Sequence, residues 1–422
     1  MNSTGDVVVS GMGVVSPIGV GIDSFWQNLL DGVSGIRVRE SFAETDMPLR
    51  IGAPIADFDP KPFVKPRKAL KIMCQPIQFG CAAANLAFED AGFEKQSLES
   101  VVSPDRIGTL FGTETFFADP AEVARVFRSC TEDDNYQHDR WGEFAMRQIQ
   151  PLWMLKYLPN MAASHISIAI DARGPSNSIC QGEASGLLAL IEAADLIKRG
   201  VVDVVIAGGT GSQMALTAML YRGIGDLSRR INEPEKASRP FDAERDGMVI
   251  GEGSGVVVLE SAEHAAKRGA TPVARLAGWS RGFSDPNRVE RNEAFVASIK
   301  AVLADSGMTP DQIGLVSANA HGSIEGDASE AQAIQSVLGD VPVVAHKSNF
   351  GNLGPGTSVV ELIGSLMALK HRKIPPTLNY ENPDPDCPVN VSNEVRSMDK
   401  SAMLKTGCSG TGQMVSVVFE GM

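Results

Sequence analysis

The chain has 422 residues, of which 43% are hydrophobic and 21% charged, so it can bury a large core in two or three domain-sized units. Its net charge of −13 argues against a nucleic-acid-binding protein, and no apolar run reaches the roughly 20 residues of a membrane span. No signal peptide is recognisable and the six cysteines form no Cys-x-x-Cys pair, so we expect a cytoplasmic protein without a disulfide framework, metal or cofactor.

The first elements alternate between strands and helices. Val7 to Ser16 is an apolar strand that enters a Gly-rich turn, and this turn lacks the third glycine of a dinucleotide-binding fingerprint. Ile22 to Gly32 and Lys68 to Gly92 have helical periodicity, and Pro76 should kink the second helix or mark its start. Near that start, several cations without an acid between them indicate either a docking surface for an acidic partner or an ordinary solvated helix approach: Lys65, Arg67, Lys68 and Lys71.

A buried helix dominates the middle of the chain. Arg106 to Gly112 predicts a short buried strand, and residues of mixed polarity follow it as far as position 160. After the bend at Gly174-Pro175, Gly182 to Gly186 forms the small first turn of a helix that is apolar on most of its surface and ends at Gly200. We expect Val201 to Ala207 to be a buried strand that ends in a turn at Gly208-Gly209.

The second half repeats the alternation. In Arg239 to Gly247 we expect Arg245 to form a structural ion pair with Asp242 or Asp246. The elements predicted further on are strands at 256–260, 273–277, 313–318, 341–345 and 414–419, and helices at 290–307, 325–338 and 359–371. Such alternation implies parallel sheets covered by helices on both faces.

Four motifs carry a resemblance to a known family. GPSNSICQGEASG at 174–186, NAHG at 319–322, KSNFGN at 347–352 and GCSGTGQ at 407–413 resemble the motifs of the β-ketoacyl synthases, the condensing enzymes of fatty-acid and polyketide assembly. The resemblance implies an α/β thiolase-like fold with two pseudo-duplicated halves in a five-layer α-β-α-β-α arrangement. It places the N-terminal half at 1–262, with a helical cap insertion at about 114–160, and the C-terminal half at 263–422. An ordinary packed helical insertion is the other reading of the cap.

The motifs depart from the family at three positions. The reactive cysteine of the family aligns with Glu183, its second histidine with Asn352, and its gating phenylalanine with Cys408. His321 and Lys347 keep their places, so the resemblance assigns the catalytic positions to residues 183, 321, 347 and 352. It assigns substrate binding to Ser323, Cys408, Gly410 and Thr411.

Glu183 decides the functional interpretation. A carboxylate at a helix start is ionised at pH 7, because its reference pKa is about 4.3, and it is a poor nucleophile toward thioesters. The helix N-terminus, Lys347 or a protonated His321 would stabilise it there. We therefore expect a silent subunit that resembles chain-length factors. Its partners would be a ketosynthase-fold chain, as a homodimer or heterodimer, and an acyl carrier protein.

Other functions remain open. The chain can be an enzyme that decarboxylates malonyl carrier protein with His321 and Asn352, or an acyltransferase without a covalent step. Cys180 or Cys408 can serve as a displaced nucleophile. A binding protein for acyl chains is the alternative outside enzymology.

Overall fold

Two sheets with the same strand order form the framework of the molecule. The computed structural model describes residues 5–39, 50–93, 98–115, 120–215, 218, 226–285 and 291–422. In the first half the strands lie in the order β8 (Ser176–Ile179), β5 (Ile107–Gly112), β9 (Val204–Ser212), β10 (Glu252–Ser261) and β1 (Val7–Ser16). In the second half the order is β13 (Pro342–Val344), β12 (Ile313–Ser317), β17 (Ala402–Cys408), β18 (Gln413–Gly421) and β11 (Ala274–Phe283). The two orders match over these five strands, which confirms the expected duplication. The second half has one further edge strand, β15 (Asn390–Val391), beside β13.

The strand directions also match between the halves. In the first half, β5 is parallel to both β8 and β9, whereas β10 is antiparallel to β9 and β1. In the second half, β12 is parallel to β13 and β17, whereas β18 is antiparallel to β17 and β11. The expectation of wholly parallel sheets was therefore wrong. The sheets join where Val7 to Val9 of β1 pairs with β11.

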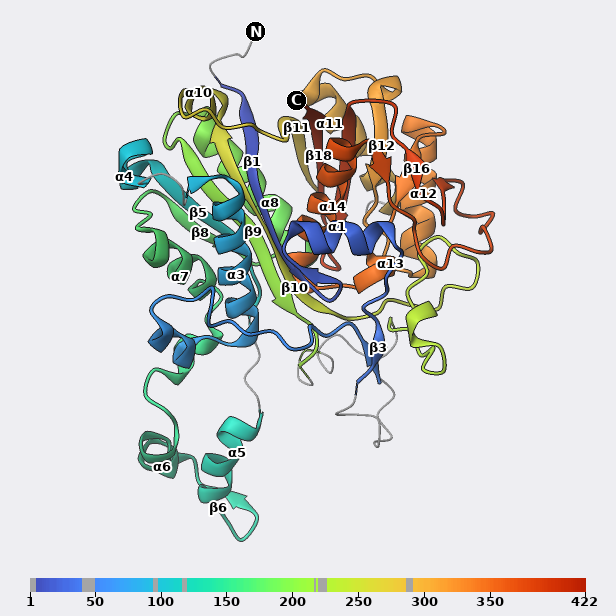
Figure 1. Cartoon of the computed structure of the whole chain (residues 1–422). Coiled ribbons are helices and arrows are strands. Elements are labelled where there is room, and N and C mark those ends of the chain that lie inside the picture. Colours follow the sequence, from blue (N-terminus) through green and yellow to red (C-terminus); the bar gives the residue numbers. More distant parts are fainter. Residues whose placement is uncertain are drawn as a thin grey trace.

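Helices fill the space between the sheets and cover their outer faces. α8 (Ser185–Lys198) and α14 (Thr357–His371) lie in the middle layer, α3 (Gln75–Asp90) and α7 (Met161–Ile170) cover the first sheet, and α11 (Arg291–Ser306) and α12 (Ile324–Leu338) belong to the second half (Figure 1). The order is thus the α-β-α-β-α arrangement that the family resemblance implies. The central hydrophobic cluster contains residues of α8 and α14 together, which explains why both helices are apolar almost all round.

The remaining elements are short. They are α1 (Ile22–Leu30), α4 (Leu98–Val101), α10 (Ala262–Lys267), α13 (Lys347–Phe350), β2 (Gly19–Val20), β3 (Arg37–Val38), β4 (Ile51–Gly52), β14 (Lys373–Ile374), β15 (Asn390–Val391), β16 (Arg396–Ser397), η1 (Arg67–Ile72), η3 (Pro104–Arg106), η6 (Gly182–Ala184), η7 (Pro234–Lys236), η8 (Pro310–Gln312) and η9 (Gly354–Gly356). Pro76 lies in the first turn of α3, so it marks the start of that helix. No helix in the described part of the chain is long and apolar enough to span a bilayer.

Two predictions about strands were wrong. β9 does not end at Gly208-Gly209 but continues to Ser212. The glycines serve close packing instead of a turn, because a Cβ on Gly209 would collide with the carbonyl oxygen of Pro355 in η9. β17 was not predicted, since the buried Lys405 interrupts its apolar pattern.

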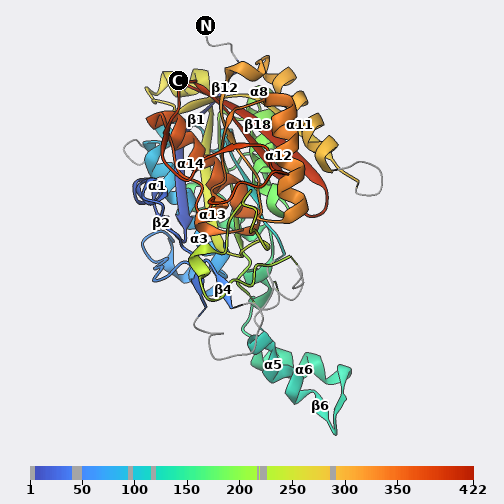
Figure 2. The ribbon, with the colours of Figure 1, turned by 90° about the vertical axis from the view of Figure 1, so that its right-hand side faces the viewer.

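A lobe projects from the body of the molecule. It contains α5 (Pro120–Ser129), β6 (Thr131–Glu132), β7 (Asn135–Tyr136), η4 (His138–Arg140) and α6 (Trp141–Gln148), and both views show it extending away from the sheets (Figures 1 and 2). Glu122 of α5 binds η5 (Trp153–Tyr157) at the base of the lobe, where Lys156 Nζ donates to its Oε1 at 2.8 Å. The lobe lies within the predicted cap, of which residues 116–119 are outside the described part.

Candidate active site

Glu183 lies buried at the start of the central helix of the first half. Gly182, with φ of +57°, directs the chain from the end of β8 into η6, which continues as α8. Only 6% of Glu183 is exposed. Its Oε1 accepts a hydrogen bond of 3.0 Å from Nδ2 of Asn352. Two residues that the sequence assigned to one site are thus in direct contact, although they lie in different halves of the chain.

The amide of Asn352 has a defined orientation. Its Oδ1 accepts a hydrogen bond of 2.9 Å from the N–H of Gly354 and lies 3.1 Å from the hydroxyl of Thr357. Its Nδ2 therefore points toward Glu183, and it also donates to Sδ of Met248 at 3.4 Å. The amide binds protein groups through both its oxygen and its nitrogen.

The loop that carries His321 is held by two buried carboxylates. It follows β12 at the carboxyl end of the strand, where α/β sheets place ligand-binding groups. Asp327 accepts the backbone N–H of His321 at 2.9 Å, and Glu330 accepts those of Asn319 and Ala320 at 2.8 Å. Burial raises the pKa of Asp327 to about 6, so it remains ionised at pH 7 and keeps accepting these bonds.

His321 is neutral. Its Nε2 lies 2.9 Å from Nδ2 of Asn319, which donates, so the ring proton is on Nδ1. Burial and the ammonium of Lys347 lower the pKa of His321 to about 3, although the nearby Glu183 opposes the shift. The expectation that a protonated His321 stabilises Glu183 was therefore wrong. Glu183 and His321 are nevertheless close enough to interact electrostatically.

Lys347 belongs to a buried ion-pair cluster beneath this loop. Its Nζ donates to Oε1 of Glu361 at 2.8 Å and to the carbonyl oxygen of Asn319. Lys405 of β17 pairs with Oε2 of the same carboxylate at 2.8 Å. Burial alone would raise the pKa of Glu361, but the ammonium groups of Lys347 and Lys405 together hold it below its usual value. Lys347 thus supports the loop from below through Asn319.

The cysteines proposed as displaced nucleophiles are in different surroundings. Cys408 ends β17, where its Sγ accepts a bond of 3.1 Å from Nδ2 of Asn319, and burial raises the pKa of its thiol to about 12. Its backbone N–H lies 3.5 Å from Oδ1 of the same asparagine. Cys180 is exposed, with its Sγ 3.5 Å from the hydroxyl of Thr113. Asn319 therefore links Cys408 to His321, whereas Cys180 contacts Thr113.

Apart from the buried Cys408, the residues predicted to bind substrate and carrier are more exposed. Ser323 precedes α12, while Gly410 and Thr411 lie exposed on the turn after β17. The predicted docking residues are all exposed around η1: Lys65, Arg67, Lys68 and Lys71. Arg245 pairs with Asp384 at 2.5 Å instead of with Asp242 or Asp246, because Asp242 binds Arg239.

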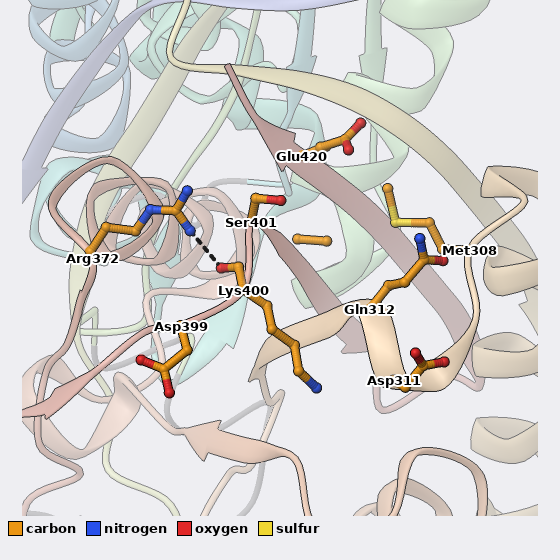
Figure 3. Close-up of a pocket in the computed structure, with 9 residues that line it drawn as sticks. Met308, Asp311, Gln312, Arg372, Asp399, Lys400, Ser401 and Glu420 are labelled. Carbon is orange, nitrogen blue, oxygen red and sulfur yellow. Dashed lines mark hydrogen bonds between the residues drawn. The ribbon is translucent and has the colours of Figure 1, made fainter.

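A polar hollow of about 360 Å³ lies away from these residues. Met308, Asp311, Gln312, Arg372, Asp399, Lys400, Ser401 and Glu420 line it (Figure 3). It is at the amino ends of β12 and β17, whereas the loop of His321 follows the carboxyl end of β12. The hollow is therefore not part of the candidate active site.

Sequence analysis did not assign several residues of the site. They are Met248, Asn319, Asp327, Glu330, Thr357 and Lys405, which orient or surround the predicted residues. Lys405 alone had a local signal, because a lysine in an otherwise apolar run is unusual unless it is paired.

Comparisons with known proteins agree with this architecture. Residues 4–265 match the "Beta-ketoacyl synthase, N-terminal domain" family and residues 274–381 its C-terminal domain. The 3-oxoacyl-[acyl-carrier-protein] synthase 2 of Coxiella burnetii is 34% identical over 430 residues, covering 98% of this chain and 99% of the relative. A solved complex of a type II PKS acyl-carrier protein with its ketosynthase bound to the hexaketide is 27% identical, with a TM-score of 0.85 and 100% of both chains covered. The ishigamide ketosynthase/chain length factor is 25% identical, with the same TM-score and coverage.

Proposed function

This chain belongs to the β-ketoacyl synthase family, and within that family we propose that it is a non-condensing partner subunit of an active ketosynthase. The observation that carries the proposal is the buried contact between Glu183 and Asn352 at the start of α8. A carboxylate held there by an amide cannot form the thioester that condensation passes through, since an acyl carboxylate would be a mixed anhydride of higher energy than the thioester it replaces.

The similar structures support the pairing. One similar structure is a ketosynthase/chain length factor, and another is a ketosynthase with an acyl-carrier protein. We propose the same two kinds of partner here, with the cations around η1 as the carrier-docking surface and a ketosynthase-fold chain as the other subunit.

Intact-mass measurement tests the proposal. The purified chain is incubated with an acyl carrier protein that carries a saturated acyl chain, and we expect no covalent acyl adduct. Condensation should appear only when a ketosynthase with an active-site cysteine is added, and the acyl adduct should then be on that protein. An adduct on this chain alone would overturn the proposal.

A second candidate is an enzyme that uses Cys408 as its nucleophile. It is favoured by the contacts of Asn319, whose Nδ2 reaches both Sγ of Cys408 and Nε2 of His321. The raised pKa of the thiol disfavours it, because the thiolate is the reactive form. If the isolated chain is acylated, loss of the adduct in Cys408→Ala but not in Cys180→Ala would identify this nucleophile.

A further inference from the structure

The N–H groups and the oxygen of the Asn352 side-chain amide are already hydrogen-bonded to other protein atoms. One amide hydrogen is directed to Oε1 of Glu183 and the other to Sδ of Met248, at 3.0 and 3.4 Å. Its oxygen accepts the N–H of Gly354, and only 1% of the residue is exposed. An amide has two N–H donors, so both are engaged by protein atoms.

The backbone of Asn352 restricts its movement. Its N–H donates to the carbonyl oxygen of Val249 at 2.7 Å, and its carbonyl oxygen accepts from Gly251 at 2.8 Å. Gly354, which orients the amide oxygen, has φ of +66°, a backbone conformation that residues with a side chain rarely adopt. The side chain of Asn352 is therefore presented to Glu183 in one orientation.

We propose that Asn352 is a positioning residue for Glu183 and that the site in consequence discriminates against acyl thioesters with a free carboxylate, in favour of neutral ones. The inference rests on the proposed function, in which the site holds an acyl group without reacting with it. The inference takes this amide N–H, which Glu183 occupies, as the donor for the carboxylate or enolate oxygen of a malonyl group. Such a ligand has to displace the side-chain oxygen that already accepts this N–H before it can bind the amide.

Two variants distinguish the effect of the hydrogen bond between Asn352 and Glu183 from the effect of the charge on Glu183. In Glu183→Ala, Nδ2 of Asn352 loses its acceptor and becomes available to a ligand. In Glu183→Gln the charge is removed, but the side-chain carbonyl oxygen still accepts the N–H of Asn352. If the free amide N–H determines the preference between malonyl and neutral thioesters, the two variants should differ in that preference. If the charge of residue 183 alone determines it, they should show the same preference.

Calorimetric binding of malonyl-pantetheine and acetyl-pantetheine to the full-length chain provides the test. In Glu183→Ala we expect the affinity for malonyl-pantetheine, relative to acetyl-pantetheine, to rise by about tenfold or more. The gain should disappear in Glu183→Ala/Asn352→Ala, and Glu183→Gln should stay within about twofold of the original protein. An equal gain in Glu183→Gln, or no gain in Glu183→Ala, would overturn the inference.

A matched control comes from the same helix. Nδ2 of Asn177, which lies exposed on β8, donates to Oε1 of the half-buried Glu192 of α8 at 3.0 Å, which makes a second carboxylate–amide pair. Glu192→Ala should leave the ratio of the two affinities unchanged. Glu183→Ser replaces Glu183→Ala if the alanine variant does not fold. Covalent acylation of the unmodified chain would contradict the proposed function. If the chain is not acylated and Glu183→Ala shows no rise in relative affinity for malonyl-pantetheine, only this inference is contradicted.

Discussion

The two central helices are equivalent in the duplicated fold, but they bury carboxylates in different ways. On α14, Glu361 receives the ammonium groups of Lys347 and Lys405 at 2.8 Å. At the start of α8, Glu183 receives the neutral amide of Asn352. The first arrangement is an ion-pair cluster that supports the loop of His321 from below. The second presents a carboxylate at the position where the family resemblance places a nucleophile. The comparison indicates that one carboxylate serves the framework and the other the site.

Removal of the charge on Glu361 should have the largest effect. Glu361→Gln leaves two buried lysines opposite a neutral amide, and breaking a buried ion pair in this way costs about 3–5 kcal/mol of the free energy of unfolding. Urea denaturation followed by circular dichroism measures it. Glu361→Gln/Lys405→Met restores the original local charge, so it should recover part of the loss. An unchanged stability would show that this cluster is not a structural element.

A third buried carboxylate, Glu260, gives an intermediate, pH-dependent effect. His264 lies 2.6 Å from it through Nδ1 and 3.2 Å from the carbonyl oxygen of Val101 through Nε2, so both ring nitrogens face acceptors. Burial would lower the pKa of His264, but Glu260 raises it above the usual value. The stabilisation is therefore fully present below about pH 6.5 and is lost as the pH rises through the folded-state pKa. His264→Gln should cost about 1–2 kcal/mol near pH 5.5 and less at pH 9, as measured by urea denaturation at both values. An equal cost at both pH values would contradict the assigned imidazolium.

Neutralisation of Glu183 should have the smallest effect on stability. Glu183→Gln keeps an oxygen that accepts the N–H of Asn352, so we expect the free energy of unfolding to change by less than about 1 kcal/mol. The same denaturation experiment checks this value beside Glu361→Gln. A loss as large as that of Glu361→Gln would remove the distinction between the two carboxylates.

Much of the fold could be predicted from local sequence patterns. The apolar periodicity of 187–197 predicts a buried helix, and the structure places α8 between the two sheets. The alternation of strands and helices predicts sheets covered by helices on both faces, since each element must bury its apolar face against another. The duplicated five-layer order was implied by the family resemblance. The position of Glu183 at a helix start was also readable, because Gly182 and the residues after it are adjacent in the chain.

The contacts that give the site its character were decided by tertiary structure. Asn352 is 169 positions from Glu183 in the sequence, and nothing local indicates that its amide is already committed to protein groups. Likewise, the sequence Gly208-Gly209 predicts a turn, whereas in the structure these glycines allow η9 to pack against β9. Hydrophobic periodicity and turn residues act over a few positions, whereas hydrogen bonds, ion pairs and close backbone packing in the core depend on which distant segments the fold brings together. The sequence by itself therefore determined the helix-covered sheets and the acid at the start of α8, and the folded chain decided what that acid contacts.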